Sequence, residues 1–233
     1  MSLHFKSEYM TNQHPILSRV IPFAAYILFL ALGDYLILLC NSVGVDVKWV
    51  YVVKIVTVLT LLLYFWRDYS ELKLKPKVRD LAFAAIAGLL VLWVWILPYP
   101  AWATLGDDVH GFNPIQGQDS AAAILWLSTR VLGAALIVPI MEELFWRSFV
   151  MRWVDNNNFL SISPDKVTTY ALVISACLFA MEHQLWLAGL FAGIVYGLLY
   201  KIYKNLWVPI FAHAVTNGLL GIWIVITGNW QYW

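Results

Sequence analysis

Long apolar runs alternate along the chain with short polar stretches that carry most of its charges. A transmembrane helix needs about 20 predominantly apolar residues, and seven segments come close to that length. These segments cover residues 20–40, 47–66, 81–97, 121–153, 167–183, 187–203 and 206–226. The pattern predicts an all-α fold, a polytopic transmembrane helix bundle of about seven spans, in which residues 1–233 form a single integral-membrane domain.

The composition supports a membrane protein over a soluble one. Hydrophobic residues make up 61% of the chain and charged residues 12%, whereas a soluble domain is about half apolar and a quarter charged. The net charge is +1, and no basic patch with interleaved aromatic residues indicates a nucleic-acid partner. Cys40 and Cys177 both lie in apolar runs without the spacing of a metal site, so we expect packed thiols.

The distribution of positive charge predicts the orientation. Residues 67–79 are rich in Lys and Arg, whereas residues 101–119 contain none. Cytoplasmic loops carry an excess of these residues, so we expect 67–79 inside and 101–119, with Asp107 and Asp108, outside. This alternation places the N-terminus inside and the C-terminus outside, and we expect the bacterial inner membrane as the location.

Charges also interrupt the apolar segments themselves. Asp34 and Lys54 lie at a similar depth in the first two segments. An interhelical ion pair is one interpretation, and two structural polar residues is the interpretation that we prefer. In the fourth segment, Pro139 predicts a kink, because proline removes a backbone hydrogen bond and clashes with the preceding turn.

The most unusual stretch is Glu142-Glu143-Leu144-Phe145-Trp146-Arg147, which carries three charges within an apolar environment. Charges inside a membrane are costly and usually face a cavity. Glu143 and Arg147 are four residues apart and can pair on one helix face, while Glu142 points about 100° away from Glu143. We therefore expect Glu143 to be structural and Glu142 to be available for chemistry, although a solvated cluster at a helix end is an alternative.

Further polar residues occur in two later segments. His183 ends the fifth segment, and His213 and Asn217 lie one helical turn apart in the seventh. An acid, two imidazoles and an amide are the groups needed to activate a water and stabilise an oxyanion. Straight, full-length spans would separate His183 from Glu142, so we expect the turn around Glu182 and His183 to lie at mid-depth in a wet cavity, where irregular backbone is tolerated.

Three motifs resemble those of a known family. They are Glu-Glu-x-x-x-Arg at 142–147, Phe-x-x-x-His at 179–183 and His-x-x-x-Asn at 213–217. In this order they resemble the CAAX prenyl endopeptidase and bacteriocin-processing family of intramembrane proteases, some bacterial members of which are labelled abortive-infection proteins. The resemblance covers about residues 120–227, and the small chain fits the prenyl-protease-related bacterial branch.

The resemblance implies a role for each motif residue. Glu142 would be the general base that activates a water, assisted by His183. His213 and Asn217 would hold the oxyanion, and Glu143 and Arg147 would orient these groups. The implied reaction is hydrolysis of a peptide bond near the terminus of a membrane-associated peptide or protein, without a cofactor.

Other functions remain open from the sequence. Glu142, His183 and His213 form a possible His-His-Glu zinc site, although no His-Glu-x-x-His pairing occurs on one helix. A non-catalytic membrane scaffold or immunity protein would use the polar residues only to lock helices together. A transporter is less favoured, because no internal repeat of spans is found.

Overall fold

The computed structural model describes residues 14–106, 113, 115 and 119–232, and Asp107 and Asp108 of the expected outer loop lie outside the described residues. The described part is all-helical, without a β-strand, as predicted. Each apolar segment is helical. The helices are α1 (Leu17–Ala31), α2 (Gly33–Val43), α3 (Lys48–Tyr64), α4 (Val78–Trp95), α5 (Ser120–Leu132), α6 (Val138–Glu143), α7 (Met151–Trp153), α8 (Thr169–Ala180), α9 (Trp186–Tyr203) and α10 (Trp207–Thr227).

The number of spans is the part of this prediction that is not confirmed. Within the described ranges, four helices are long and apolar enough to cross a bilayer, and a bent pair of helices adds a possible fifth. The four are Val78–Trp95, Ala121–Trp153, Trp186–Tyr203 and Trp207–Thr227. The first apolar segment is the bent pair, in which α1 and α2 meet at 63°. Helices α3 and α8 are shorter, with 17 and 12 residues.

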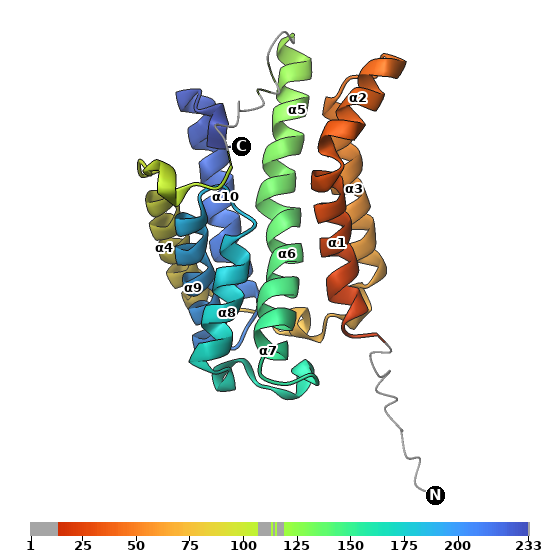
Figure 1. Ribbon diagram of the computed structural model, residues 1–233. Coiled ribbons are helices and arrows are strands. Elements are labelled where there is room, and N and C mark those ends of the chain that lie inside the picture. The colour runs from red at the N-terminus through yellow and green to blue at the C-terminus, as the bar shows by residue number, and fades with distance from the viewer. Residues whose placement is uncertain (1–13, 107–112, 114, 116–118, 233) are drawn as a thin grey trace, which may run out of the picture.

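A single long helical column, α5 through α7, stands between two groups of helices (Figure 1). Helices α1 and α3 pack together on one side, and α4, α8, α9 and α10 form the group on the other. Two pairs dominate the second group, α4 with α10 and α8 with α9. The column spans 33 residues, about 50 Å at 1.5 Å per residue, and it contacts both groups.

Glycines explain how closely α8 and α9 approach. A Cβ atom on Gly193 would lie 2.9 Å from the Cα atom of Ala176, and one on Gly189 would lie 3.2 Å from the Cα atom of Ala180. Small residues at such a crossing let two backbones pack directly against each other. The four-residue spacing of Gly189 and Gly193 therefore serves packing between these two helices.

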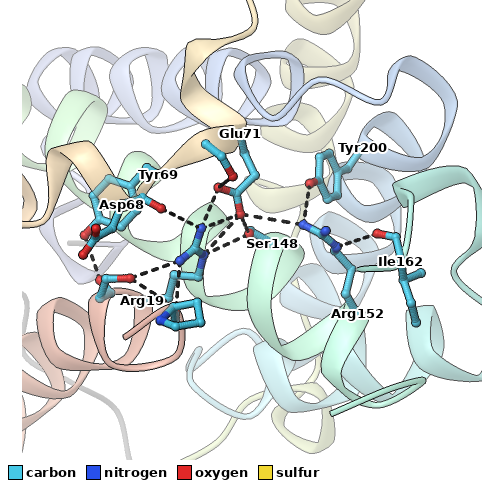
Figure 2. Close-up of polar contacts among 11 residues, drawn as sticks. Arg19, Asp68, Tyr69, Glu71, Ser148, Arg152, Ile162 and Tyr200 are labelled. Atoms are coloured by element: carbon cyan, nitrogen blue, oxygen red, sulfur yellow. Dashed lines mark hydrogen bonds and ion pairs between the residues drawn. The ribbon is translucent and has the colours of Figure 1, made fainter. Parts of the chain in front are cut away.

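A buried polar network fastens one end of the column to the first helical group (Figure 2). Arg19 of α1 pairs with Glu71, with 2.6 Å between Nη2 and Oε2, and both side chains are buried. Glu71 also accepts a hydrogen bond from Ser148 on the column, and its Oε1 lies 3.7 Å from Nη1 of Arg152. Tyr69 donates to the carbonyl of Ser18 at 2.7 Å. One carboxylate therefore joins α1, the segment after α3 and the column.

The network predicts acid sensitivity. Burial by itself would raise the pKa of Glu71, but the charge of Arg19 and hydrogen bonds from Arg19 and Ser148 outweigh burial and hold the pKa below the usual 4.5. A carboxyl whose pKa is lower in the folded state stabilises the fold above the unfolded pKa, and this stabilisation is lost as the pH falls through the lowered value. Glu71→Gln should unfold at a lower temperature at pH 7, losing about 3–5 kcal/mol because buried arginines are stranded.

Thermal unfolding of the purified protein between pH 3 and pH 8 measures this effect. The curve for Glu71→Gln should also fall less steeply on the acid side than the wild-type curve. Asp46→Asn is the control, because Asp46 forms an exposed pair with Lys48 and such pairs contribute little. Equal stability of Glu71→Gln and the wild type at pH 7 would show that the network does not stabilise the fold.

Candidate active site

The motif helix carries two irregular segments on either side of its paired glutamates. Glu142 and Glu143 end the short α6, and π-helical turns cover Gly133–Ile137 before it and Leu144–Val150 after it. Single-turn π segments inside α-helices occur frequently at functional sites. Pro139, at which we predicted a kink, lies just after the first of these turns, and the helix continues through the proline.

Glu143 forms the pair with Arg147 that the four-residue spacing predicted. Its Oε2 lies 3.0 Å from Nε of Arg147, and its Oε1 accepts a hydrogen bond from Nδ1 of His213 at 2.9 Å. Glu143 is fully buried and Arg147 is 1% exposed. The guanidinium of Arg147 lies over the ring of Phe179, 4.3 Å from its centroid. Each oxygen of the Glu143 carboxylate therefore contacts a partner, Arg147 on the same helix or His213 on α10.

The contact with Glu143 also determines how His213 is presented. Because Glu143 accepts from Nδ1, this hydrogen-bond network assigns the proton of the neutral ring to Nδ1 and leaves a lone pair on Nε2. Nε2 faces Glu142, with 3.8 Å to Oε2. The ring of Tyr196 stacks on the imidazole, with the centroids 4.8 Å apart and the planes 20° from parallel. His213 is thus held in one orientation from two sides.

His183 lies in the turn that follows α8. This helix has only 12 residues and ends at Ala180, so the turn reaches the cavity instead of a far helix end. Nδ1 of His183 lies 2.8 Å from the carbonyl oxygen of Phe179. That carbonyl can only accept, so the network again assigns the proton to Nδ1 and a lone pair to Nε2.

Asn217 makes a contact that the sequence did not indicate. Its Nδ2 donates to the carbonyl oxygen of Ala134 at 3.0 Å, within the first π-helical segment. The amide therefore ties α10 to the widened turn ahead of Glu142. An amide nitrogen carries two protons, so one N–H remains for another acceptor.

A cavity of about 410 Å³ unites the four residues for which we predicted catalytic roles. Its wall includes Glu142, His183, His213 and Asn217, from the column, the turn after α8 and α10. Glu143 and Arg147 do not line the cavity and lie behind His213. Oε2 of Glu142 is buried and has no hydrogen-bond partner in the described part of the chain. Oε2 of Glu143 also lacks a hydrogen bond but pairs with Nε of Arg147 at 3.0 Å, whereas Oε2 of Glu142 has the longer contact of 3.8 Å with Nε2 of His213. The carboxylate of Glu142 is therefore the more available of the two.

The zinc alternative was tested against the donor geometry. Within the described ranges, no group of three or more His, Cys, Asp or Glu side chains is close enough together to hold a metal ion. The predicted His-His-Glu set therefore does not fit a three-ligand site in this arrangement.

Several cavity residues were missed by sequence reasoning. Lys54 makes no ion pair among the described residues, so the pair with Asp34 is not formed, and its ammonium lies over the rings of Tyr26 and Tyr51 instead. Arg130 lines the same cavity. A charge within an apolar run was the available signal for both cations. No comparable signal pointed to the tyrosines.

Comparison with protein families agrees with the motifs. Residues 124–219 match the family model described as type II CAAX prenyl endopeptidase Rce1-like. The matched segment contains all three motifs, so the predicted family resemblance is confirmed, and the family indicates a membrane protease. No curated protein and no solved structure matches the chain.

The different surroundings of the paired glutamates predict different effects on stability. Glu143→Gln should destabilise the fold by about 3–5 kcal/mol, because it strands the buried charge of Arg147. Glu142→Gln removes a carboxylate without a hydrogen-bond partner at Oε2, so it should leave the unfolding temperature unchanged or raise it. Thermal unfolding of both variants at pH 7 makes the comparison. Equal losses in the two variants would mean that both glutamates serve the fold.

Proposed function

We propose that this chain, whose residues 124–219 match the Rce1-like family model, is a membrane-embedded endopeptidase that uses Glu142 to activate a water molecule. Its substrate is a membrane-associated peptide or protein, cleaved near a terminus. The observation that carries the proposal is the open Oε2 of Glu142, buried at a cavity that two histidines and an amide also line. A polar cluster that only locked helices together would have no use for an open buried carboxylate.

The first step is proton removal from water. Glu142 takes a proton from a water that stands between it and Nε2 of His183, which is a second acceptor in the assigned tautomer. The resulting hydroxide attacks the carbonyl carbon of the peptide bond. Glu142 then delivers its proton to the departing amine. A positioned general base of this kind contributes about 10²–10⁴-fold to the rate.

The oxyanion that forms needs hydrogen-bond donors. Asn217 offers its second N–H, since the first is held by Ala134. His213 donates from Nε2 only when that nitrogen is protonated. Glu143, which accepts from Nδ1, then balances the positive charge of the imidazolium ring. Donors fixed in advance by Ala134, Glu143 and Tyr196 need little reorganisation during the reaction.

The bilayer is the natural setting for this reaction. Four to five apolar helices indicate an integral membrane protein, and a cavity between them suits a substrate that is already in the membrane. We propose that the N-terminus lies inside, from the positive charge of residues 67–79. We also propose the bacterial inner membrane as the location, because the small chain fits the prenyl-protease-related bacterial branch of the family.

Glu142→Gln should abolish peptide cleavage by the purified protein, with a loss of at least about 10³-fold in kcat, because an amide cannot accept the proton from water. Asp34→Asn is the matched control, as Asp34 is exposed on α2 and does not line the cavity. Rates are measured with a fluorogenic peptide in detergent micelles. Wild-type turnover by Glu142→Gln would disprove the assignment of the base.

Asn217→Ala should lower kcat by about 10²–10³-fold, the usual loss when one oxyanion donor is removed. The effect on KM should be small, because the donor acts mainly in the transition state. Parallel unfolding curves show whether the bond to Ala134 also matters for stability. If Asn217→Ala loses stability but keeps kcat, Asn217 serves to hold the helices together and is not an oxyanion donor.

Hydrolysis should not require a metal ion. Activity should survive exhaustive treatment with a chelator, and elemental analysis of the purified protein should show less than one equivalent of zinc. Loss of activity that one equivalent of zinc restores would favour the zinc mechanism over the glutamate mechanism.

A further inference from the structure

Two cations line the cavity, Lys54 on α3 and Arg130 on α5. Lys54 of α3 is 8% exposed, and its ammonium lies 4.4 Å from the ring centroid of Tyr26 and 5.0 Å from that of Tyr51. The guanidinium of Arg130 lies 5.2 Å from the same Tyr51 ring. Aromatic faces attract a cation without neutralising it. The two cationic side chains are thus held beside one tyrosine.

The cavity wall has more positive than negative charge. Among the described residues, Glu142 is the only carboxylate of the wall, against Lys54 and Arg130. Lys54 forms no ion pair with any described residue, although it is more than nine-tenths buried. Ionisable side chains inside a membrane cavity usually serve a function. Two cations near one another in a poorly solvated cavity are stabilised when an anion binds between them.

The cations lie toward the Asn217 side of the cavity. The hydroxyl of Tyr51 donates to the carbonyl oxygen of Arg130 at 3.1 Å, and a Cβ atom on Gly133 would lie 2.6 Å from this hydroxyl. The cluster is therefore level with Gly133, next to Ala134, whose carbonyl accepts a hydrogen bond from Asn217. Glu142 follows nine residues after Gly133, about 13 Å along the helix at 1.5 Å per residue. An anion bound there lies on the side of the proposed oxyanion donor and away from the proposed base.

We propose that Lys54 and Arg130 bind a carboxylate of the peptide substrate and so determine which peptides are cleaved. This inference rests on the proposed peptidase function. Guanidinium and ammonium groups both form charge-assisted hydrogen bonds with carboxylates. A peptide supplies a carboxylate in two ways, at its C-terminus or in an Asp or Glu side chain, and the two sources can be told apart.

The test compares three fluorogenic apolar peptides that differ only at the last residue. One ends in a free carboxylate, one in a neutral amide, and one in an aspartate whose C-terminus is amidated. The full-length protein should cleave at least one of the two acidic peptides about tenfold or more better in kcat/KM than the neutral one, since a charge-assisted contact is worth at least that factor. Whichever acidic peptide is preferred identifies the source of the carboxylate.

Variants then connect this preference to Lys54. Lys54→Met should remove this preference, mainly through KM, so that the three peptides are cleaved with similar kcat/KM. Lys54→Arg should retain most of it, which separates a charge effect from a folding defect. Lys48→Met is the matched control, because Lys48 lies on the same helix, pairs with Asp46 at 3.0 Å and does not line the cavity.

A binding assay keeps the two proposals separate. Fluorescence anisotropy of the same peptides is measured on Glu142→Gln, with and without Lys54→Met. Tighter binding of an acidic peptide that Lys54→Met abolishes supports the carboxylate site even if the wild type cleaves none of the peptides, in which case only the peptidase function fails. Equal binding of all three peptides, or an equal loss for acidic and neutral peptides in Lys54→Met, overturns the carboxylate site.

Discussion

The arrangement of the site depends on one buried carboxylate, that of Glu143. It receives Arg147 from one turn further along its own helix and His213 from α10. Burying the guanidinium of Arg147 or the carboxylate of Glu143 without its partner would cost several kcal/mol. The buried charges are therefore stable only when these groups pack together. This requirement fixes the rotation of the motif helix against α10. It thereby turns Glu142, the neighbouring residue, toward the cavity.

Other contacts confine the same helix along its length. Asn217 holds the carbonyl of Ala134 ahead of the glutamates, and Glu71 holds Ser148 beyond them. Figure 2 shows that the second contact belongs to a network with Arg19 and Arg152, at one end of the column. A column anchored before, at and after Glu142 places its carboxylate with little freedom, which is what a reaction that depends on geometry requires.

Much of this was predictable from the sequence, because the governing signals are local. Apolar runs gave the all-helical fold, the four-residue spacing gave the Glu143–Arg147 pair, and three polar motifs gave the cavity residues. The π-helical turns were not predictable, since hydrogen bonding to the fifth residue has no sequence signature comparable to the apolar period. The pairing of Arg19 with Glu71, 52 residues apart, and the contact of Asn217 with Ala134 depend on tertiary packing. We expected α8 to stop short only because a full-length helix would have separated His183 from Glu142.

The central claim is that Glu142 activates water and does not itself attack the peptide bond. A single turnover in water enriched with ¹⁸O, with excess protein over peptide and mass spectrometry of both, tests this claim most directly. Direct attack by water predicts one ¹⁸O atom in the new carboxyl group of the product and none in the protein segment that contains Glu142. Incorporation of ¹⁸O into Glu142 itself would reveal a covalent intermediate on this residue and contradict the account.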